Sequence, residues 1–194
     1  MKLASLALTA SLLMVPSANA AVVSFEYTAS QDFSIVGDLT SVAGIASTLS
    51  TISGVISFDT STADTNADSM AGQYMTGSIT VNEIALPVYT FTMSIFDGDT
   101  SEQFSLSGQD GPESVLLSLQ AIGADAFASD ALPGGLVLGD FNALNELQFF
   151  SGNDFSQFTV STLTPTDMPQ VPVPAALPLF LSGLAGLRLL RRRR

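Results

Sequence analysis

The feature that most limits how this chain can fold is a period of two in its apolar residues between Ala21 and Thr166. In the stretch from Val88 to Phe96, VYTFTMSIF, apolar side chains alternate with threonine and serine. Such alternation is typical of a β-strand with one buried and one solvated face. The same pattern predicts further strands at Val23–Tyr27, Ile52–Phe58, Gly77–Val81, Phe104–Leu106, Val115–Leu119, Leu136–Leu138, Leu147–Phe150 and Phe155–Val160.

Turn-rich segments separate these runs, and little of the chain between them has helical periodicity. Many short strands of this kind predict a mainly β fold, and we expect an antiparallel β-sandwich, jelly-roll or lectin-like, over residues 21–164. The segments SGVISF (53–58) and TGSITV (76–81) echo each other, as two paired strands do. Residues 38–50 fit neither strand nor helix clearly.

The charges are strongly segregated. All 18 acidic residues lie between Glu26 and Asp167, whereas the basic residues are confined to Lys2, Arg188 and Arg191–Arg194. The middle of the chain therefore forms no salt bridge of its own, and its carboxylates repel one another. Phosphate contacts depend on lysine and arginine, so this distribution excludes nucleic acid as a partner.

The N-terminus predicts a targeting segment. Lys2, an apolar run from Leu3 to Val15, and small residues at Ala18 and Ala20 form the pattern of a signal peptide, residues 1–20, cleaved before Ala21.

The C-terminus predicts a second one. Residues 165–174 form a proline-rich linker and sorting box, and residues 175–194 form a short transmembrane helix with an arginine cluster. The cluster is expected to stay in the cytoplasm as an anchor. Its members are Arg188, Arg191, Arg192, Arg193 and Arg194.

The tail, VPVPAALPLFLSGLAGLRLLRRRR, resembles the PEP-CTERM class of bacterial sorting signals in its VPLPA-type variant. The resemblance is carried by a short apolar helix, terminal arginines and, before them, the box Val171, Pro172, Val173, Pro174, Ala175 and Ala176. It implies a protein held briefly in the inner membrane, processed near the box by an exosortase, and then moved to the cell surface or the exopolysaccharide matrix. A plain uncleaved tail anchor is the alternative.

The residue types present limit catalysis. The chain has no histidine or cysteine, and its only lysine is Lys2. Histidine-based triads, thiol nucleophiles and ordinary zinc sites are therefore excluded. A pair of carboxylates could still hydrolyse a glycosidic bond. Tyr27, Tyr74 and Tyr89 could line a sugar site, although at strand spacing tyrosines more often pack in a core. We expect no enzymatic activity.

Two acidic loops are calcium candidates, because carboxylate and carbonyl oxygens suit Ca²⁺. One contains Asp97 and Asp99, and the other contains Asp64 and Asp68. Neither follows the EF-hand pattern, and solvated turns are the alternative interpretation.

The function that the sequence predicts is that of an exported surface or extracellular-matrix protein with a structural or adhesive role. Its expected partners are signal peptidase, an exosortase and, in the matrix, exopolysaccharide. A calcium- or carbohydrate-binding module is the alternative, with a carboxylate-based glycosidase less favoured. No cofactor other than Ca²⁺ is expected.

Overall fold

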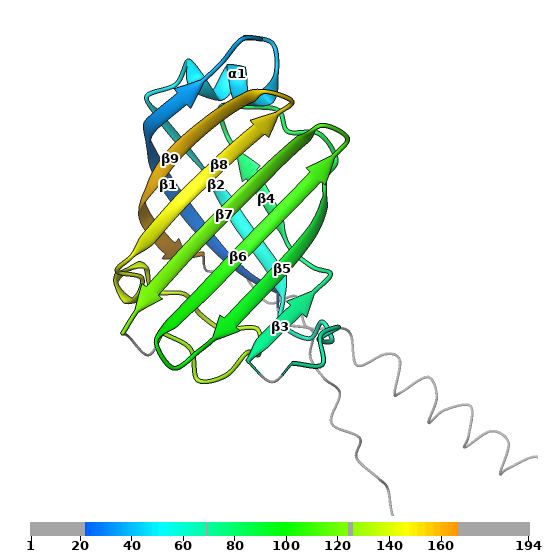
Figure 1. Ribbon diagram of the computed structural model, residues 1–194, viewed down its shortest axis with the longest axis vertical. Helices are drawn as coiled ribbons and strands as arrows, with labels where there is room; N and C mark the ends of the chain where they lie inside the picture. Colours follow the sequence, from blue (N-terminus) through cyan, green and yellow to red (C-terminus); the bar gives the residue numbers. More distant parts are fainter. Residues whose placement is uncertain (1–21, 69, 124–125, 167–194) are drawn as a thin grey trace, which may run out of the picture.

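The computed structural model describes residues 22–68, 70–123 and 126–166, and these form a mainly β, antiparallel fold (Figure 1). Most of the elements in these ranges are strands. The elements are β1 (Val22–Ile35), α1 (Val42–Ser47), β2 (Thr51–Asp59), β3 (Ala71–Tyr74), β4 (Ser78–Val81), β5 (Thr90–Asp97), β6 (Ser101–Asp110), β7 (Glu113–Ile122), the 3₁₀ turn η1 (Leu138–Asp140), β8 (Leu144–Ser151) and β9 (Asp154–Pro165).

The strands described form one continuous sheet in the order β3-β5-β6-β7-β8-β9-β1-β2-β4. The mainly β, antiparallel part of the prediction is confirmed. Where the sequence suggested a sandwich, the structure has a single sheet that curls until β2 and β4 lie behind β6 and β7 (Figure 1). The pairing of the two echoing segments is also confirmed, because β2 and β4 run antiparallel with Gly54 opposite Val81.

Two features explain why the sheet curls. One is a pair of bulges in β1, and the other is the short connection between the two edge strands. The register between β1 and β9 shifts between Thr28 and Ala29 and again between Gln31 and Phe33, and such bulges bend a strand and increase its twist. The two edge strands, β3 and β4, are consecutive in the chain and only residues 75–77 join them. The sheet must therefore curl far enough to bring its edges within reach of this link.

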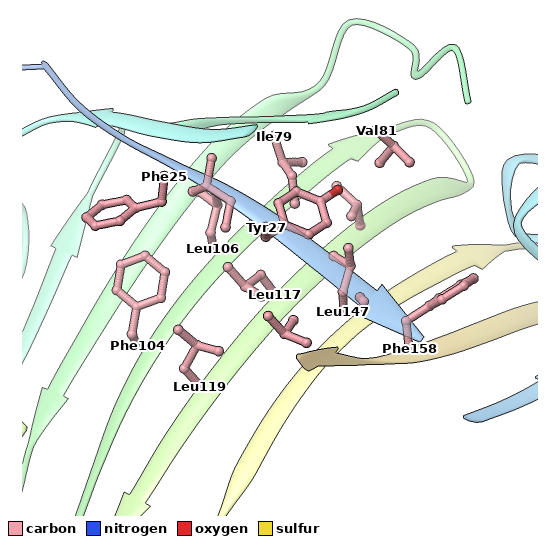
Figure 2. Packing of buried hydrophobic residues seen from close by; sticks show 14 of the residues in the cluster. Phe25, Tyr27, Ile79, Val81, Phe104, Leu106, Leu117, Leu119, Leu147 and Phe158 are labelled. Atoms are coloured by element: carbon pink, nitrogen blue, oxygen red, sulfur yellow. The ribbon is translucent and has the colours of Figure 1, made fainter. Parts of the chain in front are cut away.

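The inner face of the curled sheet encloses the apolar core (Figure 2). Phe25, Tyr27 and Ile79 from one end of the sheet face Leu106 and Leu117 from the other. The rings of Phe58 on β2 and Phe104 on β6, five strands apart in the sheet, lie 5.9 Å apart between centroids. Packing across the interior thus joins the two ends of the sheet, and this packing supplies the main stabilisation of the fold.

Helix α1 and the segment after β7 contribute buried side chains at the ends of the core. Ala43 and Ala46 of α1 are fully buried, and the helix packs on β8 and β9. The buried carboxylate of Glu102 accepts hydrogen bonds from the backbone N–H groups of Ala126 and Phe127, at 2.6 and 2.8 Å. These bonds hold Phe127 where its ring meets that of Phe141.

One strand prediction is wrong, and one strand was missed. Leu136–Leu138 is not a strand, although Leu136 is buried, and Leu138 begins the turn η1. The edge strand β3 was not predicted, because four residues that include a glycine carry too little pattern. Among the described residues, no helix is long and apolar enough to cross a membrane.

Candidate functional site

A shallow hollow of about 560 Å³ lies on the outer face of β5, β6 and β7. Its side chains are those that alternate with the buried residues of these strands. Among the described residues, hydroxyl, amide and apolar groups line it, and no charged residue does. The outward-facing lining residues are Thr90, Thr92, Ser107, Gln109, Ser114, Leu116 and Phe150.

Strand register places these side chains in two rows across the sheet. Thr90 lies opposite Gln109, which lies opposite Ser114, and Ser114 lies opposite Phe150. In the next row, Thr92, Ser107 and Leu116 are neighbours. The rows thus combine short serine side chains with the larger side chains of Leu116 and Phe150.

The first row continues into an aromatic track on the same face, formed by Phe150, Phe155 and Phe33. The centroids of Phe150 and Phe155 are 5.0 Å apart, and those of Phe155 and Phe33 are 6.2 Å apart. Phe33 is 52% exposed. The hollow and the aromatic track together form a surface across β5 to β9 and β1 that is partly apolar and rich in hydrogen-bonding groups, with the carboxylate of Glu146 beside the track on β8.

A second hollow, also of about 560 Å³, is acidic and lies beside α1. In it, the carboxylate of Asp154 accepts hydrogen bonds from the backbone N–H groups of Gly37 and Asp38, at 2.7 and 3.1 Å, and from the Ser41 hydroxyl at 2.8 Å. Ser41 in turn caps α1 by accepting from the N–H of Gly44. This acidic group therefore has a structural task, which is to tie β9 to the start of the helix.

Hydrogen bonds lower the pKa of two carboxyl groups in the acidic hollow, so neither Asp154 nor Asp38 suits the acid role in a glycosidase. The hydrogen bond from Gly37, followed by that from Ser41, holds the pKa of Asp154 below its usual value. Bonds from the side chain and backbone of Thr40 likewise lower the pKa of Asp38. A glycosidase needs one carboxyl group whose pKa is raised so that it can donate a proton.

In the predicted calcium loop before β3, the aspartates act as backbone acceptors. Asp64 accepts from the N–H groups of Asn66 and Gln73, both at 2.8 Å, and Asp68 accepts from that of Met70 at 3.0 Å. The bonds from Gln73 and then Asn66 lower the pKa of Asp64. These contacts match the solvated-turn interpretation of the loop.

The structure brings the two predicted calcium loops side by side. The N–H of Asp97 donates to the carbonyl of Met70 at 2.9 Å, which continues the pairing of β3 with β5. Asp99 is exposed on the turn that follows. Within residues 22–68, 70–123 and 126–166, no three acidic groups lie close enough together to hold a metal ion. Calcium binding stays a prediction.

The three tyrosines belong to the core and do not line a sugar site. Tyr27, Tyr74 and Tyr89 are 1%, 4% and 8% exposed (Tyr27 in Figure 2). The hydroxyl of Tyr27 donates to the carbonyl of Thr80 at 2.9 Å, and that of Tyr74 donates to the carbonyl of Asp130 at 2.8 Å. Burial raises the pKa of Tyr27 well above its usual value and that of Tyr89 to about 12.

The targeting residues predicted from the sequence lie outside the described part of the chain, so their roles stay predictions. At the N-terminal end these are the cleavage residues Ala18, Ala20 and Ala21. At the C-terminal end they are the sorting box Val171, Pro172, Val173, Pro174, Ala175 and Ala176, and the anchor residues Arg188, Arg191, Arg192, Arg193 and Arg194.

Sequence reasoning missed the outer hollow and the aromatic track. The strand alternation marked their residues as outward-facing, but only the strand register shows that they are neighbours.

No protein-family model matches this chain. No curated protein sequence matches it, and no solved structure does.

Proposed function

We propose that this protein is exported and sorted to the cell surface or extracellular matrix, where it has a structural or adhesive role. The observation that carries the proposal is the order of the terminal features around one domain. A signal-peptide pattern precedes the β domain, and a Val-Pro-x-Pro-Ala-Ala box, an apolar stretch and an arginine cluster follow it. An exosortase of the PEP-CTERM system is the proposed processing enzyme.

The β domain supports a role without catalysis. Its carboxylates in the acidic hollow accept backbone and hydroxyl hydrogen bonds that maintain the fold. We propose that the curled sheet serves as a sandwich-like scaffold of the lectin or jelly-roll kind, which keeps its interior for packing and leaves its outer face for contacts. Adhesion is the second candidate role, and the neutral outer hollow favours it.

The first test is the intact mass of the protein recovered from the surface or medium of its native host. A mass that corresponds to a chain from Ala21 to near Val171, with or without an added group, would support both targeting assignments. A mass that retains the arginine cluster would indicate an anchored protein and would contradict release to the surface.

A variant test addresses the arginine cluster directly. Replacing the four arginines Arg191, Arg192, Arg193 and Arg194 with serine should stop processing and surface delivery, because the positive charges hold the tail in the cytoplasm. The matched control replaces the same residues with lysine, which keeps the charge and should process normally. Normal processing of the serine variant would show that the account of the tail is wrong.

A further inference from the structure

We propose that the outer hollow and the aromatic track bind a neutral polysaccharide chain that lies across strands β5 to β9. The proposal deepens the adhesive part of the proposed function and rests on it for the supply of a polysaccharide. It does not depend on how the chain is sorted.

The first argument is the chemistry of the lining. A sugar presents apolar C–H faces and a rim of hydroxyl groups, so its site needs aromatic surface beside hydrogen-bonding groups. Phe150 supplies the aromatic surface next to hydroxyl and amide groups of Thr90, Gln109 and Ser114. The hollow is also within the size range of ligand sites, about 300–1,000 Å³.

Several of these polar groups are available to a ligand. Gln109 reaches the carbonyl of Gly111 at 3.4 Å, and Ser107 reaches that of Thr92 at 3.3 Å, both long bonds that a ligand can replace. In the described part of the chain, the side-chain hydroxyls of Thr90 and Ser114 have no hydrogen-bond partner. A bound sugar hydroxyl can therefore pair without displacing a strong internal bond.

The second argument is the shape of the surface. The row from Thr90 through Gln109, Ser114 and Phe150 to Phe155 crosses four strand intervals. At about 4.8 Å per interval this is about 19 Å, which suits an extended polymer better than a single small ligand. Phe33 extends the same surface by one more strand.

The third argument is electrostatic and decides between occupants. No lysine or arginine occurs between residues 3 and 187, so an anionic polymer would find no counter-charge and would be repelled by the carboxylates. No carboxylate of the residues that the structure describes lines the hollow, so a cation finds no charged ligand there. A second copy of the chain would bring like charge to like charge. A neutral glycan is not repelled by the carboxylates and needs no charged ligand, so it fits this surface best.

The test uses the full chain, purified in mild detergent, on immobilised polysaccharides. The neutral panel contains dextran, laminarin, galactomannan and xylan, and polygalacturonate is the anionic counterpart. We expect retention on at least one neutral polysaccharide and none on polygalacturonate. Phe150→Ala should weaken the retention at least about tenfold, since it removes the aromatic surface.

Two further variants separate binding from folding. Ser114→Ile fills the hollow with a residue that suits a strand, and it should also weaken binding. Phe96→Ala is the control, because Phe96 is 39% exposed on the same face of β5 but does not line the hollow. It should leave binding unchanged, and melting temperatures of all variants report folding.

Three results would overturn the inference. They are no retention on any neutral polysaccharide, equal retention of the unaltered chain and both hollow variants, and retention on polygalacturonate. A dimer in sedimentation that Phe150→Ala dissociates, without glycan binding, would assign the face to contacts between copies. If the intact mass retains the arginine cluster but the protein binds a neutral glycan, only the sorting proposal is rejected. If the mass shows processing but no neutral glycan is bound, only this inference is rejected.

Discussion

At the residue scale, Asp154 shows how a domain without basic side chains uses a carboxylate. Its oxygens accept from two backbone N–H groups and from the Ser41 hydroxyl that caps α1. These donors are uncharged, so the residue is satisfied by hydrogen bonds where many proteins use an ion pair. The loss of one such acceptor would leave several donors without partners.

Replacing Asp154 with asparagine should lower the melting temperature by several degrees at neutral pH. The new side chain has an N–H₂ group in place of one carboxylate oxygen, and this group cannot accept from the N–H and O–H donors that face it. Asp99→Asn is the matched control: Asp99 is exposed, and its substitution removes one repelling charge without removing a hydrogen bond seen in the described structure. Thermal unfolding of both variants checks the prediction. Equal melting temperatures for Asp154→Asn and Asp99→Asn would contradict it.

The same pair of variants tests the pH dependence. Hydrogen bonds hold the pKa of Asp154 below its ordinary 3.8 in the folded state. The stability that it contributes is therefore complete above the unfolded-state pKa and is lost as pH falls through the lowered pKa. The gap in stability between the unaltered chain and Asp154→Asn should stay constant from neutral pH down to about pH 4.5 and narrow at lower pH. A gap that narrows already between about pH 7 and about pH 5 would assign the effect to another group.

At the element scale, the pairing of β2 with the edge strand β4 requires a glycine. A Cβ added at Gly54 would lie 1.8 Å from the carbonyl oxygen of Thr80 and 2.9 Å from the hydroxyl of Tyr27. That hydroxyl donates to the same Thr80 carbonyl. Gly54 thus permits the close approach that places the Tyr27 hydroxyl, β2 and β4 together.

Gly54→Ala should destabilise the protein by about 1–3 kcal/mol, because β4 must move away and the Tyr27 hydrogen bond must lengthen. Urea unfolding measures the effect. Gly139→Ala is the control, since Gly139 is exposed with nothing within 4 Å of an added Cβ, and it should change stability by less than about 0.5 kcal/mol. A Gly54→Ala variant as stable as this control would show that β4 is not held tightly against β2.

Sequence alternation predicted most strands because burial on one face leaves a local trace in each of them. It missed β3 and did not resolve α1, whose six residues are fixed by the Ser41 cap and by packing on β8 and β9 rather than by a long helical pattern. Register and strand order are non-local, so the neighbours of Ser114 and Phe150 could not be read from their spacing. The hollow could therefore be found only from the structure, whereas the sequence alone indicated that its residues face outward.

At the scale of the whole molecule, stability must come from apolar packing and hydrogen bonds against a background of repulsion. The 18 carboxylates between Glu26 and Asp167 have no basic residue among them. The inner face of the sheet nevertheless packs across the interior, as the contact between Phe58 and Phe104 shows. The segregated charge could be read from the sequence in full, but the acceptor roles of Asp154 and Glu102 could not, because their donors are distant in the chain.

Raising the ionic strength should therefore stabilise the protein. From about 0.01 M to about 1 M NaCl the screening length falls from about 30 to about 3 Å, which weakens repulsion between carboxylates in the compact state. We expect the melting temperature to rise steadily over this range, with CaCl₂ and MgCl₂ equivalent to each other at matched ionic strength. A gain specific to calcium would instead identify a bound ion, and single and double Asp64→Asn and Asp97→Asn variants would then locate it. A melting temperature independent of NaCl would mean that repulsion between the carboxylates does not limit the stability of this fold.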